Sequence, residues 1–143
     1  MVHLRKKFMD NDPTLTGEAL NALYTAVGWN ADGWRTPERS GLVLEQTPYF
    51  VTAWEGDILV GFGRILADVY SAQIMDVMTH PDFRRQGIAQ EVVVRLVRYA
   101  DSAGLPLLLI SAASVTTLYG RFGFVSADPQ TDVLMYRPLP EPC

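Results

Sequence analysis

The stretch Arg84-Arg85-Gln86-Gly87-Ile88-Ala89 lies between an apolar run, residues 74–79, and a segment with helical periodicity. A turn that opens a helix leaves backbone N–H groups without partners inside the helix, and these groups attract anions together with the positive end of the helix dipole. Gly87 has no Cβ, so the backbone can approach an anion closely, and Arg84 and Arg85 add permanent positive charge. The stretch therefore predicts a diphosphate cradle at the start of a helix.

Two common nucleotide-binding loops do not match this sequence. The loop of nucleotide hydrolases requires G-x-x-x-x-G-K-[ST], and the sequence has no Gly-Lys pair. The dinucleotide fingerprint requires G-x-G-x-x-G; Gly61 and Gly63 supply the first two glycines, but Leu66 stands at the third. The pattern that remains is Arg84-x-x-Gly87-x-Ala89, after a strand that ends near Thr79.

This pattern resembles the acyl-CoA-binding motif of the GNAT family of N-acetyltransferases, which reads Q/R-x-x-G-x-G/A. A second segment, Leu118-Tyr119-Gly120-Arg121-Phe122-Gly123-Phe124, resembles the helix of that family that carries a tyrosine and is closed by a Gly-Phe pair. One helix and one strand separate the two motifs, as they do in the family. The resemblance covers residues 49–138. Residues 74–81 and 114–119 are also similar to a branch that includes plastid and cyanobacterial arylalkylamine (serotonin-type) N-acetyltransferases.

The composition is typical of a globular protein and limits the kinds of partner that it is expected to bind. The 143 residues, 48% hydrophobic and 20% charged, suit a single domain over residues 1–143. No apolar run approaches the ~20 residues that span a bilayer, and the N-terminus lacks the apolar core of a signal peptide, so no membrane partner is expected. The only cysteine is Cys143, so no internal disulfide is expected, and the cytoplasm is the default compartment. The net charge of −4 argues weakly against a nucleic-acid partner and is compatible with a cationic amine substrate.

Hydrophobic periodicity predicts six strands and four helices. The strands are expected over residues 2–8, 49–55, 57–67, 71–79, 106–111 and 132–137. The helices are expected from Asp12 or Thr16 to Gly28, from Thr36 to near Glu45, over 86–104 and over 114–121. Several neighbouring strands form an antiparallel meander, and the helix over 86–104 crosses over to a parallel neighbour. This predicts an α/β fold of the GNAT type, with a mixed, mostly antiparallel central sheet and helices on both faces.

The resemblance implies acetyl-CoA as cosubstrate and no metal. The residues that it assigns to the binding of acetyl-CoA belong to the cradle, the strand before it and the segment after the crossover: Val77, Met78, Thr79, Arg84, Arg85, Gln86, Gly87, Ile88, Ala89, Gln90 and Ser114. In the family, the strand before the cradle parts from its neighbour, so its backbone pairs with the pantetheine arm and an N–H group can donate to the acetyl oxygen. Many relatives have an Asn where this chain has residues 111–115, and a hydroxyl of Ser111 or Ser114 would replace its contact.

Two side chains are candidates for proton transfer. The resemblance implies Tyr119 as the general acid, since a phenol with a pKa of ~10 stays protonated at pH 7 and can donate to a departing thiolate. A tyrosine that only packs its ring is the alternative. Asp76 is a lone carboxylate in an apolar strand. It could bind the substrate ammonium, relay its proton through water or bond to neighbouring backbone, and a pKa of ~3.9 makes it a poor direct base unless burial raises it.

The acceptor side is less defined. Trp29, Trp34, Tyr49 and Phe50 flank the region that shapes the acceptor site in the family. An aromatic wall there would suit an arylalkylamine, and packing in the core explains these residues equally well. The expected function is the direct transfer of an acetyl group from acetyl-CoA to a primary amine, on a small molecule or a protein, within a ternary complex. The alternative is a non-catalytic acyl-CoA-binding sensor or interaction module of the same fold. The sequence is compatible with a monomer and with a homodimer.

Overall fold

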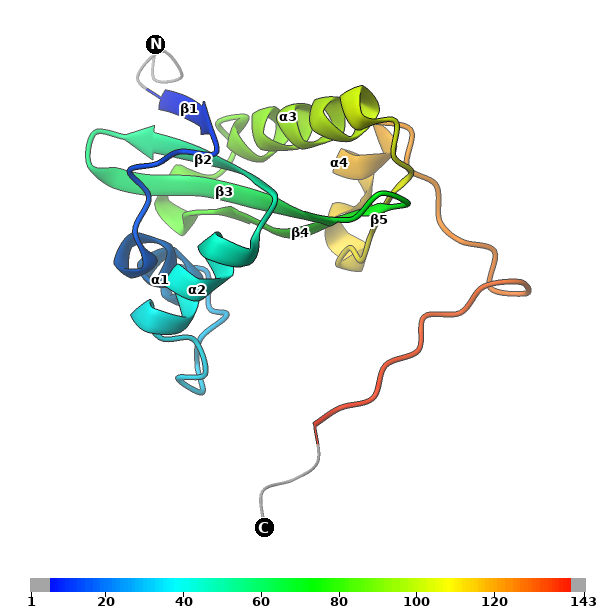
Figure 1. Cartoon of the computed structure of the whole chain (residues 1–143), viewed down its shortest axis with the longest axis horizontal. Coiled ribbons are helices and arrows are strands. Elements are labelled where there is room, and N and C mark those ends of the chain that lie inside the picture. Colours follow the sequence, from blue (N-terminus) through cyan, green and yellow to red (C-terminus); the bar gives the residue numbers. More distant parts are fainter. Residues whose placement is uncertain (1–5, 140–143) are drawn as a thin grey trace.

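A five-stranded sheet in the order β1-β2-β3-β4-β5 forms the centre of the fold in the computed structural model, which describes residues 6–139 (Figure 1). The strands β1 to β4 are antiparallel neighbours, and β5 is parallel to β4. The bounds are Lys6–Asp10 for β1, Tyr49–Glu55 for β2, Ile58–Ala67 for β3, Ala72–Thr79 for β4 and Leu107–Leu109 for β5. The predicted mixed, mostly antiparallel sheet is confirmed.

The helices lie on both faces of this sheet, as predicted. The bounds of the three longest are Gly17–Ala26 for α1, Pro37–Gln46 for α2 and Ile88–Ala103 for α3. α1 and α2 cover one face of the sheet and α3 covers the other (Figure 1). Thr16 and Thr36 cap α1 and α2, because their hydroxyls accept hydrogen bonds from backbone N–H groups three residues later. Asp12, the other predicted start of α1, instead accepts hydrogen bonds from side chains of β2.

The alternation of side chains along the strands fills a core on each face of the sheet. Tyr49 and Phe50 are neighbours in β2 and therefore point to opposite faces. Tyr49 stacks on Tyr99 of α3, with 4.3 Å between the ring centroids, whereas Phe50 packs against Phe62 on the side of α1. Both residues are buried. Of the two alternatives for Tyr49 and Phe50, an aromatic wall for the acceptor or packing in the core, the structure shows packing in the core.

Gly61 and Gly63 of β3 allow α3 to pack close to the sheet. A Cβ at Gly63 would lie 2.6 Å from Val92 Cγ1, and a Cβ at Gly61 would collide with the side chain of Ile88. Carbon atoms do not approach each other so closely, so a larger residue at either position would push α3 away from the sheet. The G-x-G pair that fails the dinucleotide pattern thus has a packing role, and it helps to place the start of α3.

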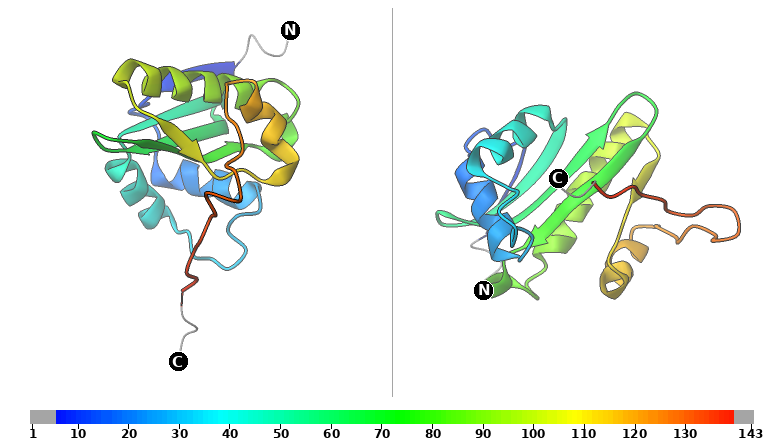
Figure 2. Two further views of the ribbon diagram at one scale, coloured as in Figure 1. Left: turned by 90° about the vertical axis from the view of Figure 1, so that its right-hand side faces the viewer. Right: turned by 90° about the horizontal axis from the view of Figure 1, so that it is seen from below.

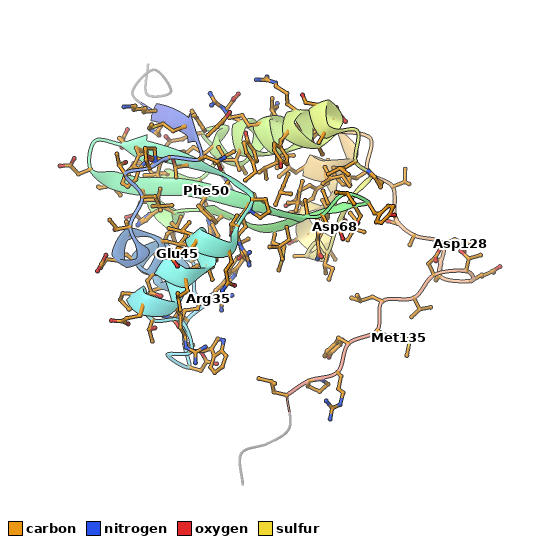
Figure 3. All side chains as sticks on the ribbon, in the orientation of Figure 1. Arg35, Glu45, Phe50, Asp68, Asp128 and Met135 are labelled. Carbon is orange, nitrogen blue, oxygen red and sulfur yellow. The ribbon has the colours of Figure 1, made fainter. Side chains whose placement is uncertain are left out.

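The last predicted strand, residues 132–137, is absent from the structure. After the short helix α4 (Thr116–Gly120) the chain leaves the body of the protein without helix or strand up to residue 139 (Figure 2). Val133, Met135 and Tyr136 are 70%, 85% and 82% exposed, and Figure 3 shows Met135 on this extended segment. The apolar residues have the pattern of a strand, but a strand also needs a neighbour with which to pair. Among the described residues, β5 pairs only with β4.

Three boundaries also differ from the prediction. The strand expected over residues 106–111 is only three residues long, as β5. The helix expected over residues 114–121 is divided into a 3-10 turn, η3 (Ala113–Val115), and α4. The first strand continues to Asp10, beyond the predicted end at residue 8, while its predicted residues 2–5 lie outside the described part of the chain.

Candidate active site

β4 contains a bulge and separates from β5. The register between β3 and β4 shifts between Phe62 and Arg64, and on β4 the residue Asp76 has a positive φ of 56°. β5 pairs with β4 only over Ala72–Ile74. Within the described chain, the backbone of residues 75–79 therefore has no strand partner on the side of β5. The separation of these two strands, which the family resemblance implies, is confirmed.

The gap between the strands opens into a cavity of about 620 Å³, which we call the α3 cavity. Its wall combines the end of β4, the loop and first turn of α3, and the segment that contains α4. The lining residues are Val27, Trp29, Val77, Met78, Thr79, Arg84, Arg85, Gly87, Ile88, Ala89, Gln90, Ala112, Ser114, Val115, Leu118 and Tyr119. The structure thus brings together ten of the eleven residues predicted to bind acetyl-CoA, along with the predicted acid.

α3 begins at this cavity without a side-chain cap. Gly87 is its N-cap residue, with a φ of 79°, and no described side chain accepts a hydrogen bond from the first turn, whereas threonines cap α1 and α2. The first N–H groups of α3 therefore remain available to an anion, and the helix dipole and two arginines favour negative charge there. Apart from the residues next to Gly87 in the chain, no atom of residues 6–139 lies within 4 Å of the position that a Cβ at Gly87 would take, so the space above the loop is open. These features fit the predicted diphosphate cradle.

One of the predicted contacts differs, at Gln86, and the structure specifies two others in more detail. Gln86 does not line the α3 cavity, and its buried Oε1 has no hydrogen-bond partner among the described residues. Ser114 lines the α3 cavity, whereas Ser111 lines a separate cavity beside β5. The side chain of Met78 is buried in the core on the side of α1, so Met78 contributes its backbone to the wall of the α3 cavity, as predicted.

Tyr119 is half-buried at the wall of the α3 cavity. Its ring packs edge-on against Phe124, with 5.9 Å between the centroids. Burial raises the pKa of Tyr119 above its ordinary value of ~10. The phenol therefore keeps its proton throughout the neutral range, and it is able to donate that proton to a group bound in the cavity.

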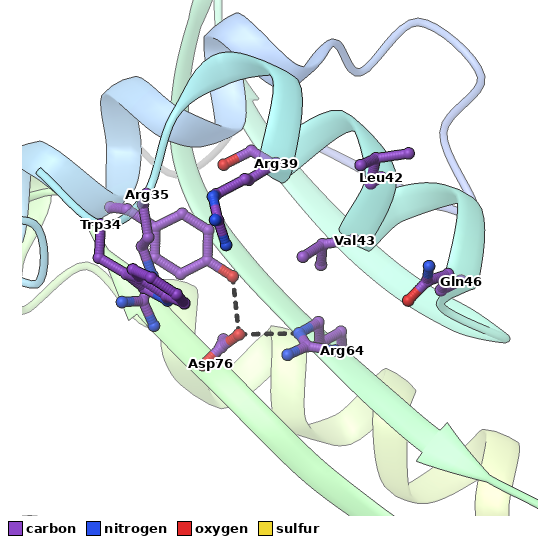
Figure 4. A pocket seen from close by; sticks show the side chains of 10 residues that line it. Trp34, Arg35, Arg39, Leu42, Val43, Gln46, Arg64 and Asp76 are labelled. Atoms are coloured by element: carbon purple, nitrogen blue, oxygen red, sulfur yellow. Dashed lines mark hydrogen bonds and ion pairs between the residues drawn. The ribbon is translucent and has the colours of Figure 1, made fainter. Parts of the chain in front are cut away.

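A second cavity of about 310 Å³ lies on the face of the sheet that α1 and α2 cover, and we call it the arginine cavity. Its lining residues are Tyr24, Trp34, Arg35, Arg39, Ser40, Leu42, Val43, Gln46, Arg64 and Asp76 (Figure 4). Three of these side chains are cations, and Asp76 is the one anion in the lining. The cavity therefore combines a carboxylate with an excess of positive charge.

Asp76 is held in the arginine cavity by two short hydrogen bonds. Its Oδ2 accepts one from the hydroxyl of Tyr24 and one from Nε of Arg64, both at 2.7 Å (Figure 4). Burial, and then the negative charge of Asp76, raise the pKa of Tyr24 well above its ordinary value, so its hydroxyl remains a donor. The next residue, Val77, lines the α3 cavity, so consecutive residues of β4 reach the two cavities.

Aromatic rings hold the other two arginines of this cavity. Cζ of Arg35 lies 4.5 Å from the centroid of the Tyr24 ring, and its Nη1 donates to the carbonyl of Trp29 at 3.1 Å. Cζ of Arg39 lies 4.0 Å from the centroid of the Trp34 ring. Neither arginine forms an ion pair with any residue that the structure describes. Stacking on the rings orients both guanidinium groups, and within residues 6–139 no ion pair neutralises either charge.

Sequence reasoning does not identify Tyr24, Arg35, Arg39 or Arg64 as site residues. One signal is present: Arg64 is the only charged residue in the apolar run 58–67, as Asp76 is in its own strand. Tyr24 has the helical spacing of a core residue, and the other two arginines have the pattern of surface residues. These four residues come together only because α1 and α2 pack on the sheet, and the local pattern of the sequence does not specify that packing.

Within residues 6–139, no three His, Cys, Asp or Glu side chains gather so that they could hold a metal ion. No helix in that part of the chain is both long and apolar enough to cross a membrane.

Comparisons with known proteins agree with this geometry. A model of the acetyltransferase (GNAT) domain family matches residues 15–134. The chain is 34% identical over 134 residues to ycf52 of Pyropia yezoensis, described as an uncharacterized N-acetyltransferase, with 90% of this chain and 75% of the relative covered. It is 25% identical to ycf52 of Porphyra purpurea with the same coverage. The solved structure of the GNAT family acetyltransferase SP0256 from Streptococcus pneumoniae TIGR4 has the same fold, with a TM-score of 0.76. The two sequences are 22% identical, and the match covers 95% of this chain and 99% of that chain.

Proposed function

This chain belongs to the GNAT family of acetyltransferases, and on that premise we propose that it transfers an acetyl group from acetyl-CoA directly to a primary amine in a ternary complex. The family implies acetyl-CoA as the cosubstrate. One observation supports direct transfer between the two substrates: Asp76 lines the arginine cavity, while the adjacent Val77 lines the α3 cavity. An amine in the first cavity and a thioester in the second would meet at β4, with no need for a covalent enzyme intermediate.

The loop before α3 and its first turn bind the diphosphate of the donor in this proposal. The uncapped N–H groups of Ile88, Ala89 and Gln90 donate to phosphate oxygens, and Arg84 and Arg85 add charge at the same place. Gly87 leaves open the space that a side chain would fill. The backbone of residues 77–79, which has no strand partner on the side of β5 in the described part of the chain, would bond the pantetheine arm, and one of its N–H groups would polarise the acetyl carbonyl.

Asp76 acts on the acceptor amine. An alkylamine has a pKa of ~10.4, so a bound amine is an ammonium ion that must lose a proton before it attacks. Oδ2 of Asp76 already accepts two hydrogen bonds, and no donor among the described residues occupies Oδ1. Oδ1 is therefore the atom that would hold the ammonium beside Val77 and pass its proton to water.

Tyr119 completes the reaction as the general acid. When the thioester carbon–sulfur bond breaks, the sulfur carries negative charge, and a nearby phenol can donate a proton to it. The position of Tyr119 in the lining of the α3 cavity and its raised pKa both support this role. Its hydroxyl then regains a proton from solvent before the next turnover.

An arylalkylamine is a second candidate for the acceptor. Trp34 lines the arginine cavity and is exposed, so its ring could stack on an aromatic substrate. The sequence similarity to the arylalkylamine branch points the same way. Trp29 lines the α3 cavity instead, so of the four aromatic residues expected on the acceptor side only Trp34 is available for this contact.

Acceptor screening with acetyl-CoA tests the proposed function. We expect free thiol to be released only when both the enzyme and a suitable primary amine are present, with the acetylated amine identified by its mass. The panel should contain small aliphatic amines, tryptamine, and a peptide with a free N-terminus and a lysine. If acetyl-CoA stabilises the protein against heat but no amine supports thiol release, the non-catalytic acyl-CoA-binding alternative holds instead.

A further inference from the structure

We infer that the acceptor carries an anionic group, a carboxylate or a phosphate, in addition to its primary amine, and that Arg35 and Arg39 bind this group in the arginine cavity. The inference rests on the proposed function, because it takes the arginine cavity as the acceptor site. Figure 4 shows the guanidinium groups of Arg35, Arg39 and Arg64 around Asp76. Three cations and one anion line this cavity in a chain whose net charge is −4.

The charges in the cavity do not balance without a ligand. Asp76 forms an ion pair with Arg64, with 2.7 Å between Oδ2 and Nε. Among the described residues, neither Arg35 nor Arg39 forms an ion pair. Arg39 also lies in the first turn of α2, where Glu38 offsets the positive potential of the helix end, so the excess of positive charge comes from the arginines themselves. Arg35 is half-buried and Arg39 is exposed, so both can be reached by a dissolved ligand, and an anion bound at both would neutralise their charge.

The arginines are already held in position to receive an anion. Each guanidinium group stacks on an aromatic ring, Arg35 on Tyr24 and Arg39 on Trp34. A stacked guanidinium uses its face for the ring and keeps the N–H groups of its edge for hydrogen bonds. Arg35 uses one of these for the carbonyl of Trp29. The remaining edges match the paired oxygens of a carboxylate or phosphate.

This arrangement binds a substrate at two points. The anionic group lies at Arg35 and Arg39, and the ammonium lies at Oδ1 of Asp76, next to the α3 cavity. The cavity of about 310 Å³ is near the lower limit of ligand sites, so it favours a small molecule over a protein acceptor. A diamine fits poorly, because its second ammonium would face the two unpaired arginines.

Matched pairs of amines test the inference. Initial rates are measured with saturating acetyl-CoA for γ-aminobutyrate against butylamine, and for phosphoethanolamine against ethanolamine. We expect the anionic member of at least one pair to have a kcat/KM about ten-fold higher or more, the gain typical of a hydrogen bond to a charged group. A preference confined to the first pair identifies a carboxylate, and one confined to the second identifies a phosphate. Tryptamine in the same series reports on the arylalkylamine alternative.

Two variants locate the preference in the cavity. In Arg39→Gln, the ratio of kcat/KM between the anionic and the uncharged member should fall toward one, through KM for the anionic member. Arg98→Gln removes the same charge from an exposed position of α3 that lines neither cavity, and it should keep the ratio of the parent protein. Equal rates for both members of each pair, or a ratio that survives Arg39→Gln, overturn the inference and leave acetyl transfer itself intact.

A binding measurement separates this inference from the proposed function. In the presence of CoA, γ-aminobutyrate or phosphoethanolamine should raise the melting temperature, while butylamine and ethanolamine should raise it less. If no amine is acetylated, the proposed function fails, and the same titration still decides whether the cavity binds anionic amines. Equal stabilisation within both pairs, or none, contradicts the inference.

Discussion

Tyr119→Phe is expected to lower kcat by about 10²-fold or more while acetyl-CoA binds with nearly unchanged affinity. The hydroxyl acts only as negative charge develops on the departing sulfur, and a general acid of this kind contributes about 10²–10⁴-fold. The phenylalanine ring preserves the edge-on packing against Phe124. Steady-state rates at saturating substrates measure the first quantity, and a thermal titration with acetyl-CoA measures the second.

The pH dependence of kcat gives this prediction a second readout. The acid form of Tyr119 is the active form, and burial raises its pKa above the ordinary value of ~10. Loss of the proton from Tyr119 should therefore depress kcat only above pH ~10, with no decline from this group between neutral pH and that point. In Tyr119→Phe this alkaline limb should disappear.

Tyr70→Phe is the matched control for Tyr119→Phe. Tyr70 is 82% exposed and lines neither the α3 cavity nor the arginine cavity. Removal of its hydroxyl should leave kcat at the value of the parent protein. An unchanged kcat in Tyr119→Phe, without a pre-steady-state burst that would reveal slow product release, contradicts the acid role. Loss of stability and of acetyl-CoA binding together would show that Tyr119 has a packing role.

Gly87→Val is expected to abolish the thermal stabilisation of the protein by acetyl-CoA. A Cβ at Gly87 meets no atom of the other described residues within 4 Å, chain neighbours aside, so the branched side chain would occupy the space proposed for the diphosphate. Gly87 also has a φ of 79°, a conformation that costs other residues about 1–2 kcal/mol. The variant should therefore melt at a lower temperature than the parent even without ligand, and acetyl-CoA should no longer raise that temperature.

Gly104→Val separates blockage of the cradle from backbone strain. Gly104 caps the other end of α3 with a φ of 68°, and a Cβ there also meets no atom within 4 Å. Both variants should lose stability for the same backbone reason, but Gly104→Val should retain the full shift with acetyl-CoA. If Gly87→Val shifts as much as the parent, the assignment of the diphosphate to this loop is wrong.

The sequence predicts the parts of this protein that depend on local pattern. The cradle at residues 84–89 combines a strand end, a glycine and a helix start, and each of these is determined within a few residues. For the same reason, the threonine caps and the long amphipathic helix after the cradle are found where they are expected. The GNAT resemblance supplies the separation of β4 from β5 and the segment with Tyr119, because both motifs lie at the spacing of the family.

Features that depend on long-range packing escape prediction. Tyr24 belongs to α1 by its spacing, yet its hydroxyl bonds Asp76, which is 52 residues away in sequence. Tyr49 and Phe50 are both large aromatic residues of one strand, but the alternation of β2 directs their rings into opposite cores. The apolar residues at 132–137 have strand propensity, and propensity does not provide a pairing partner.

The central claim is that the acetyl donor and the amine meet at β4 in one complex. Initial rates measured over a grid of acetyl-CoA and amine concentrations test this claim most directly. Direct attack predicts double-reciprocal lines that intersect, because thiol is released only after both substrates have bound. Parallel lines, together with a burst of thiol in the absence of amine, would contradict the claim, since they show that the acetyl group passes to the enzyme first.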